Sequence, residues 1–271
     1  MLEKISVITC VYSGDQLEHV EASFSSILNQ SFNNVDLLVY VDGPVEESVD
    51  EYLESLRENN NFFIFKSDVN SGLAFGLNRL IDYSVCSGYA YIARMDADDI
   101  SSLYRIEKQV NFMRNNPEID VLGASCKEFG ATYALDKKSL PSSHEDLYKF
   151  SIARCPFIHP SVMFRTSVFE SGYRYPTNTA FTEDMALWFI LLKDGFKFAN
   201  LDEVLLEYRL NENTIGRRIG YKKAVSEINL RIKYMFLLEQ FSIRNTILIS
   251  SRLFFHIMPK GVLKLLYKYL R

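Results

Sequence analysis

Short runs of β-forming residues recur at a nearly constant interval through the first 125 residues. They begin at Ile5, Val35, Phe62, Tyr89 and Ile119, so that their starts lie 27 to 30 residues apart. This interval holds one strand, one helix and two short loops, which is the repeat of a parallel βαβ sheet. The spacing therefore predicts an α/β fold with a mainly parallel sheet flanked by helices, although it does not give the order of the strands.

The composition supports a globular chain. Apolar residues make up 48% of the 271 residues and charged residues 24%, which excludes wholesale disorder. The four cysteines form no Cys-x-x-Cys pair, so neither a disulfide framework nor a zinc knuckle is expected. The sequence has no apolar run of the ~18–20 residues that span a bilayer, and its N-terminus does not resemble a signal peptide. We expect a cytoplasmic protein without a membrane span.

Charge is distributed unevenly along the chain. Residues 217–271 carry 12 Lys and Arg against 2 acidic residues, whereas the preceding residues are acidic overall. From Pro259, Lys260, Lys264, Lys268 and Arg271 share one face of a helix opposite an apolar face. This pattern predicts a basic amphipathic tail on the anionic inner face of the cell membrane. The alternative is a terminal helix packed on its own domain. No nucleic-acid motif accompanies the charge, so nucleic acid is not an expected partner.

Polar residues follow four of the predicted strands. In an open α/β sheet, ligands bind at the carboxyl ends of the strands, so these residues are candidates for a binding site on one edge. They are Thr9 and Tyr12 after the first strand, Asp42 after the second, Asn70-Ser71-Gly72 after the third, and Arg94 to Asp99 after the fourth.

The acidic residues after the fourth strand are the most informative group. Asp96, Asp98 and Asp99 concentrate negative charge at the end of a predicted buried strand, where uncompensated carboxylates repel one another. A hard divalent cation such as Mg²⁺ or Mn²⁺ would relieve the repulsion. In the alternative interpretation, Asp98 and Asp99 only solvate a loop or favour the start of the next helix.

Six segments in order resemble the family 2 glycosyltransferases, which are nucleotide-sugar-dependent enzymes with the GT-A fold, and in particular a subgroup that makes bacterial surface polysaccharides. The resemblance covers about residues 4–216. It rests on Ser6 to Tyr12, Val41-Asp42-Gly43, Asn70 to Leu73 with Leu77-Asn78-Arg79, Arg94 to Asp99, His159 to Arg165, and Thr182 to Trp188.

The resemblance implies a nucleotide-sugar half over about residues 1–125 and an acceptor half over about 126–216, followed by the tail at 217–271. In the first half, it implies that Asp42 accepts a hydrogen bond from uracil, in a base pocket completed by Thr9 to Tyr12. Asp96 would hold the ribose or share a metal ion, and Asp98 would ligate that metal. Asn70 and Gly72 would also line the donor site.

In the second half, the resemblance implies that Asp184 is the catalytic base, with Glu183 directed at the acceptor or supporting the helix. His159 is a candidate on the acceptor side or beside the diphosphate. Arg79 and Arg94 are candidates for phosphate binding, or alternatively for surface ion pairs. The sequence departs from the family at Asn211, where many relatives carry a metal-binding His; Asn211 or Glu212 is a possible substitute.

These residues suit an inverting transfer, since that reaction needs a carboxylate base and a cation that stabilises the departing diphosphate. A glycosidase would need a carboxylic acid instead of the metal. We therefore expect a Mn²⁺- or Mg²⁺-dependent hexosyltransferase. Its expected donor is a UDP-sugar, with UDP-galactose or UDP-glucose favoured. Its expected acceptor is an undecaprenyl-diphosphate-linked N-acetylhexosamine or oligosaccharide in O-antigen or capsule synthesis. Two alternatives are a sugar nucleotidyltransferase and a membrane-docked nucleotide-binding subunit without turnover.

Overall fold

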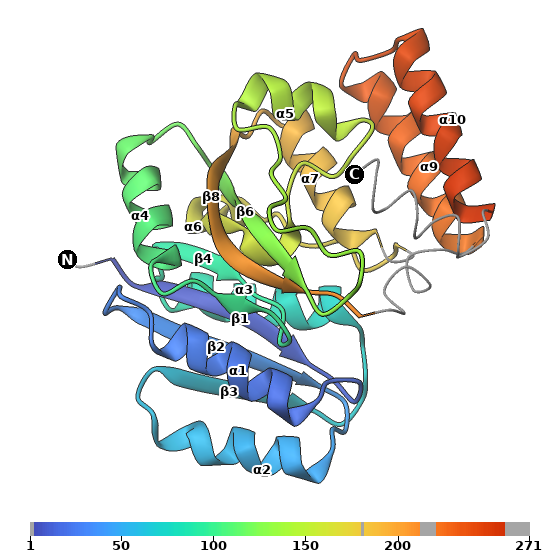
Figure 1. Cartoon of the computed structure of the whole chain (residues 1–271). Helices are drawn as coiled ribbons and strands as arrows, with labels where there is room; N and C mark the ends of the chain where they lie inside the picture. Colours follow the sequence, from blue (N-terminus) through green and yellow to red (C-terminus); the bar gives the residue numbers. More distant parts are fainter. Residues whose placement is uncertain (1–2, 180–181, 212–220, 258–271) are drawn as a thin grey trace.

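The computed structural model describes residues 3–179, 182–211 and 221–257 (Figure 1). Within these ranges, eight strands form one sheet in the order β3-β2-β1-β4-β7-β6-β8-β5. The strands are β1 Ile5–Val11, β2 Val35–Asp42, β3 Phe62–Ser67, β4 Tyr91–Arg94, β5 Ile100–Ser101, β6 Val121–Phe129, β7 Met163–Arg165 and β8 Phe198–Arg209.

The first half of the sheet has the predicted parallel arrangement. Strands β3, β2, β1 and β4 are neighbours and all pair in parallel. Every residue of β2 is buried, as expected for a central strand covered by helices on both faces. The prediction of a parallel α/β sheet is confirmed here, and β1, β2 and β3 start where the sequence places them.

The second half of the sheet is mixed. Strand β7 pairs antiparallel to both β4 and β6, whereas β6 and β8 run parallel to each other. The long strand β8 also pairs antiparallel with the two-residue strand β5, which directly follows the acidic residues. The sheet thus brings the end of β8 beside the acidic residues, about 110 positions earlier in the sequence.

Helices cover both faces of the sheet and form two cores. One core contains α1, α2 and α4, and the other contains α3, α5, α6, α7 and the C-terminal helices. Consecutive residues of β1 point to opposite faces, so that Val7 lies in the first core and Ile8 in the second. The helices are α1 Leu17–Leu28, α2 Glu47–Ser55, α3 Leu73–Cys86, α4 Arg105–Asn115, α5 His144–Ser151, α6 Thr166–Glu170, α7 Glu183–Lys193, α9 Tyr221–Leu237 and α10 Ile243–Ile257, with short 3-10 turns η1 Leu56–Glu58 and η2 His159–Ser161.

Helices α9 and α10 form a hairpin that packs on the rest of the chain. Tyr234 of α9 stacks on Phe189 of α7 with 4.8 Å between the ring centroids, and Ile249 of α10 belongs to the same core. The described part of the basic segment therefore packs on its own domain, which is the alternative left open by the sequence. The basic amphipathic helix predicted from Pro259 lies outside the described residues.

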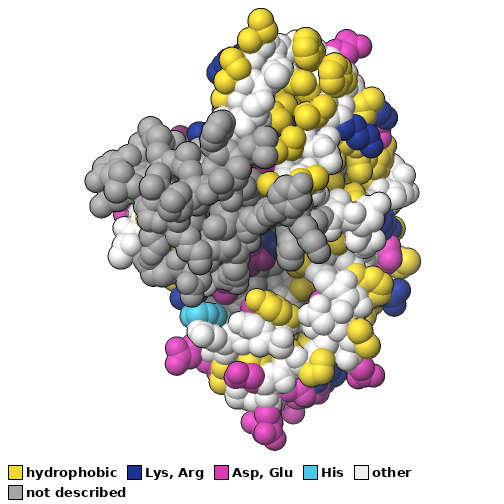
Figure 2. All heavy atoms as spheres, turned by 90° about the vertical axis from the view of Figure 1, so that its right-hand side faces the viewer, with side chains coloured by type: hydrophobic (Ala, Val, Ile, Leu, Met, Phe, Trp, Pro, Cys, Tyr) yellow, Lys and Arg dark blue, Asp and Glu magenta, His cyan; other side chains and the backbone are white. Residues whose placement is uncertain are grey.

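The outer side of the hairpin is apolar as well. Figure 2 shows hydrophobic side chains gathered over the upper part of this face, where α9 and α10 lie. Nevertheless, none of the described helices has both the length and the apolarity to cross a bilayer.

Candidate active site

The predicted donor-side residues lie along one edge of the sheet. Because β1, β2 and β4 are parallel neighbours, the carboxyl ends of these strands meet there. Thr9 is fully buried near the end of β1, Asp42 is the last residue of β2, and Asp96 follows β4 by two residues. Tyr12 is 41% exposed just beyond β1, and Asp15 accepts a hydrogen bond from its backbone N–H. The edge predicted from the sequence is thus present.

Asp42 holds the loop that follows β3. Its two carboxylate oxygens accept hydrogen bonds from the backbone N–H groups of Ser71, at 2.7 Å, and Gly72, at 2.9 Å. Asn70 donates from its side chain to the backbone oxygen of Asp42 at 3.0 Å. Gly72 precedes α3 with a φ of 90°, which favours glycine. A carboxylate offers about four acceptor positions, so Asp42 keeps capacity for a further donor such as a uracil N–H.

The three acidic residues after β4 form a compact cluster. Asp96, Asp98 and Asp99 each offer an oxygen, and these atoms all lie within 4.8 Å of one another. Burial, followed by the charge of Asp96, raises the pKa of Asp98 to about 6, and the same causes raise the pKa of Asp99 above its ordinary value. Bringing three carboxylates together in a partly buried place is costly unless a cation joins them.

The end of β8 fixes Asp99 in this cluster. The backbone N–H of Arg209 donates to Asp99 Oδ1 at 2.7 Å, and the Arg209 side chain donates to the backbone oxygen of Asp98, also at 2.7 Å. Asp99 is fully buried, and its Oδ2 has no hydrogen-bond partner among the described residues. The sequence did not predict Asp99 as a ligand, although it lies in the acidic run. Because hard oxygen donors suit Mg²⁺ or Mn²⁺, the donor set fits a divalent cation.

Arg94 is a buried cation beside the cluster. Its side chain is 2% exposed and forms an ion pair with Asp96. Burial alone would lower the pKa of Arg94, but the charge of Asp96 offsets this and the pKa is raised. Its Nε and Nη1 have no hydrogen-bond partner within the described part of the chain. Unused donors on a buried guanidinium suit a phosphate oxygen, the role expected from the sequence.

Tyr175 is a buried residue that connects His159 with α3, and sequence analysis missed it. Its hydroxyl is 2.9 Å from His159 Nε2, and its backbone exchanges two 2.8 Å hydrogen bonds with the Asn78 side chain. Burial raises the pKa of the Tyr175 hydroxyl most strongly. The charge of Arg94 lowers this pKa, and the charge of Asp184 raises it. Burial and Arg94 also hold the pKa of His159 well below its usual value. His159 is thus a neutral hydrogen-bonding partner of Tyr175.

Asp184 lies in the first turn of α7, next to Glu183. Its Oδ1 accepts from the backbone N–H of Met185 at 2.7 Å, and the Cys155 thiol donates to its Oδ2 at 3.8 Å. A thiol is a weak donor, so the carboxylate keeps its capacity to accept a proton. Both acidic residues are partly buried, in a position where the helix dipole favours negative charge.

Two further residues from the sequence analysis, Arg79 and Asn211, are exposed. Arg79 follows Asn78 on α3 and is exposed, on a side of the helix about 100° away from Asn78. Asn211 is exposed, and its backbone oxygen accepts a hydrogen bond from Tyr133 at 2.8 Å. Asp99 lies in the acidic cluster together with Asp96 and Asp98, and Glu212 lies outside the described residues.

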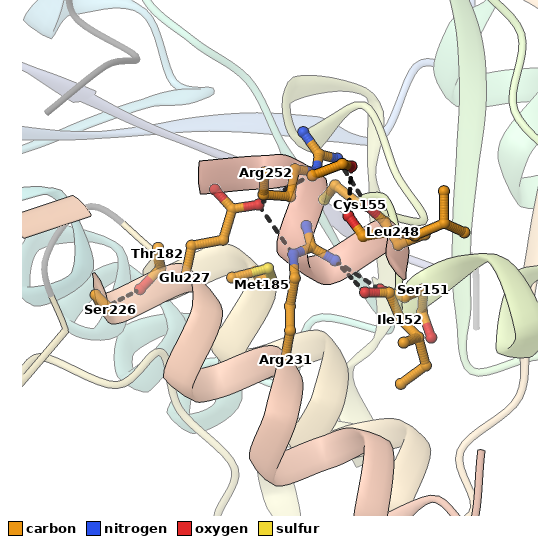
Figure 3. A network of polar contacts seen from close by, with 12 residues as sticks. Ser151, Ile152, Cys155, Thr182, Met185, Ser226, Glu227, Arg231, Leu248 and Arg252 are labelled. Atoms are coloured by element: carbon orange, nitrogen blue, oxygen red, sulfur yellow. Dashed lines mark hydrogen bonds and ion pairs between the residues drawn. The ribbon is translucent and has the colours of Figure 1, made fainter. Parts of the chain in front are cut away.

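The α9–α10 hairpin contacts Thr182 and the end of α5 (Figure 3). The Ser226 hydroxyl lies 3.1 Å from Thr182, two residues before Asp184. Arg231 is 2% exposed and donates to the backbone oxygens of Ser151 and Ile152, at 3.1 and 2.7 Å. These oxygens lie at the C-terminus of α5, which attracts cations. The hairpin thereby holds the segment that leads to Cys155.

Glu227 completes this network. Its carboxylate pairs with Arg231 at 2.9 Å and with Arg252 of α10 at 3.7 Å. Arg252 also donates to the backbone oxygen of Ala153 at 2.7 Å. Both helices are therefore tied to residues 151–153 through buried or half-buried charges.

Replacing Arg231 should destabilise the protein. We expect Arg231→Met to lower the free energy of unfolding by about 3 kcal/mol, because it removes a buried ion-pair partner of the partly buried Glu227 and leaves the backbone oxygens of Ser151 and Ile152 without their donor. Urea unfolding measures the change. Lys233→Met is the matched control, since Lys233 is exposed on the same helix and its loss should change stability by less than about 0.5 kcal/mol. Equal stability of the two variants would show that the network does not anchor the hairpin.

Comparison with known proteins shows the family to which the chain is similar. The family model for glycosyl transferase family 2 matches residues 6–173. An amylovoran biosynthesis glycosyltransferase, AmsE of Erwinia amylovora, is 30% identical over 97% of both chains. A UDP-Gal:alpha-D-GlcNAc-diphosphoundecaprenol beta-1,3-galactosyltransferase of Escherichia coli is 29% identical over 98% of this chain and 95% of that one.

Solved structures share the fold. TarS 1-349 of S. aureus, in complex with UDP, has a TM-score of 0.65 at 14% identity, covering 92% of this chain and 70% of that one. The mannosyltransferase PcManGT of Pyrobaculum calidifontis, in complex with GDP-Man and Mn²⁺, has a TM-score of 0.60 at 12% identity, covering 98% and 84%. The GT-A fold expected from the sequence is confirmed.

Proposed function

This chain belongs to glycosyl transferase family 2, and we propose that it transfers a hexose from a UDP-sugar to a lipid-linked saccharide during the synthesis of a bacterial surface polysaccharide. UDP-galactose or UDP-glucose is the favoured donor. The acceptor is an N-acetylhexosamine or oligosaccharide on undecaprenyl diphosphate, in O-antigen or capsule assembly. The names of the Erwinia and Escherichia relatives support this choice of pathway and acceptor.

The observation that carries the proposal is the pairing of opposite charges at the edge of the sheet. Three carboxylates lie within 4.8 Å of one another, beside a buried guanidinium with two unused donors. Asp96, Asp98 and Asp99 would hold Mn²⁺ or Mg²⁺, and Arg94 would bind a phosphate oxygen. The bound cation would supply stabilisation of the charge that grows on the departing diphosphate. Asp42, with Thr9 and Tyr12, would receive the uracil ring.

Asp184 is the proposed base for the acceptor. It takes the proton of an acceptor hydroxyl as that oxygen bonds to the anomeric carbon, and the bond to the diphosphate breaks to release UDP. Attack from the opposite face inverts an α-linked donor into a β-linked product. Tyr175 is buried, with its hydroxyl 2.9 Å from His159 Nε2, and would hold that histidine, the candidate on the acceptor side, in place.

The leading alternative is a nucleotide-binding subunit that has lost turnover. It would keep the donor-side residues, but it would not need Asp184 at the start of α7. The match to a glycosyl transferase family already disfavours the sugar nucleotidyltransferase considered from the sequence.

UDP release tests the proposal directly. The protein is incubated with a panel of UDP-sugars and Mn²⁺ or Mg²⁺, with or without a GlcNAc- or GalNAc-diphosphate-lipid acceptor, and with an EDTA control. We expect one donor to give UDP release that depends on both the acceptor and the metal. UDP binding by calorimetry without release from any donor would instead support the binding subunit.

A further inference from the structure

The hairpin carries a second apolar surface, directed away from the core. Six large apolar side chains of this hairpin tip are between 41% and 79% exposed. They come from the end of α9, the turn and the start of α10. The hairpin tip consists of Ile232, Phe236, Leu237, Phe241, Ile243 and Ile247.

Helical geometry makes the hairpin tip one continuous surface. Ile232 and Phe236 are four residues apart on α9, as are Ile243 and Ile247 on α10, so each pair lies on one side of its helix. The rings of Phe236 and Phe241 stack with 5.4 Å between their centroids and join the two helices. An apolar area of this kind on a protein surface marks an interaction site more often than an ordinary solvated face.

The tip is not needed to hold the hairpin on the body. That task falls to the opposite side of the two helices, where Tyr234, Met235, Leu238 and Ile249 are buried in the core. Arg231 adds its hydrogen bonds to α5 from the buried side. The exposed apolar residues therefore remain available to a partner.

The charges around the tip favour an anionic bilayer as that partner. Lys233 and Arg244 are exposed beside the apolar residues, and Glu239 is the acidic residue in the turn. The other acidic residue of segment 217–271, Glu227, is already paired with arginines. Apolar residues with two cations beside them suit insertion at the headgroup boundary of anionic lipids.

We propose that the hairpin tip inserts into the anionic surface of the membrane and is the principal membrane contact of this protein. This inference rests on the proposed function, because a lipid-linked acceptor is what gives the enzyme a reason to work at a bilayer. At the other end of the hairpin, Ser226 of α9 contacts Thr182, two residues before the proposed catalytic base Asp184. Docking by the tip would fix the position of Asp184 relative to the membrane surface.

Sedimentation with vesicles tests the inference on the full chain. The vesicles contain phosphatidylglycerol and phosphatidylethanolamine in equal parts, and vesicles of phosphatidylcholine alone serve as the neutral reference. The test variant combines Phe241→Ser with Ile243→Ser, two of the most exposed apolar residues of the tip. The control combines Leu103→Ser with Tyr104→Ser, a matched aliphatic and aromatic pair about half exposed elsewhere.

We expect the wild type and the control to sediment with the anionic vesicles and to bind the neutral ones more weakly. The tip variant should lose about tenfold or more in partitioning, since it gives up the insertion of two large apolar side chains. Because both residues are exposed, its circular dichroism and melting temperature should match the wild type. Undiminished sedimentation of the tip variant would overturn the proposal.

Two further measurements separate the competing explanations. If the combined replacement of Lys260, Lys264, Lys268 and Arg271 by Gln abolishes sedimentation while the tip variant still binds, the basic end is the contact and the proposal is wrong. The proposal is also wrong if the wild type does not bind vesicles, and light scattering finds a dimer for the wild type but a monomer for the tip variant. UDP release with a detergent-solubilised acceptor tests the enzyme separately, so failure of one proposal does not mimic failure of the other.

Discussion

Asp184→Asn should reduce the rate of sugar transfer by about 10²- to 10⁴-fold, the range that a general base contributes. The amide keeps the size of the side chain, and its oxygen can still accept the hydrogen bond from Met185 N–H, while its NH₂ group faces the Cys155 sulfur, a weak acceptor. It cannot take a proton from the acceptor. The loss should therefore affect turnover, measured as acceptor-dependent UDP release, without unfolding the site.

Affinity for UDP should not change in this variant. Asp184 lies in α7, whereas the proposed base pocket lies at the ends of β1 and β2, so calorimetry should give the wild-type dissociation constant. Glu183→Gln is the matched control, because it removes the neighbouring carboxylate from the same helical turn. A large loss in Glu183→Gln with little change in Asp184→Asn would assign the base to Glu183 instead.

The parallel half of the fold could be predicted because its signals are local. Apolar strands such as Val35–Asp42 read as continuous β-forming runs, and the stripe on Leu17–Leu28 has helical spacing. Strand β7, with only three residues, has no such signal, because its place is set by pairing with β4 and β6. The antiparallel part of the sheet therefore emerged only from the structure.

The candidate site, like the fold, could be predicted only where its signals are local in the sequence. The acidic run was visible, but the position of Asp99 in it depends on the backbone N–H of Arg209, 110 residues away in sequence. Tyr175 lies in a stretch without a periodic pattern, and its position depends on Asn78, 97 residues earlier. In the sequence, Arg231 could be recognised only as one of the cations of the basic segment 217–271. Its burial against the end of α5 follows from the packing of whole helices, which no local pattern encodes.

Removal of divalent metal should reduce UDP release to the background rate, and Mn²⁺ or Mg²⁺ should restore it. The acidic cluster requires this result if it holds the cation, because without the metal the three carboxylates repel the diphosphate, and the single charge of Arg94, already paired with Asp96, does not balance it. Asp98→Asn should lower metal-dependent activity by at least about 100-fold, since even residues that only support metal ligands cost 10–100-fold. Raising the metal concentration should recover part of the loss.

Two variants sharpen this test. Asp68→Asn removes an exposed acidic residue outside the cluster and should leave the metal dependence unchanged. Asp99→Asn keeps an oxygen that can accept the hydrogen bond from Arg209 N–H but removes the charge. If Asp99 is a ligand, Asp99→Asn should need a higher metal concentration for activity, at an unchanged free energy of unfolding. If Asp99 only supports β8, the metal concentration that Asp99→Asn needs should match that of the wild type. Full activity of the wild type in EDTA would mean that the carboxylates hold no cation, and that Arg94 is the counter-charge for the diphosphate.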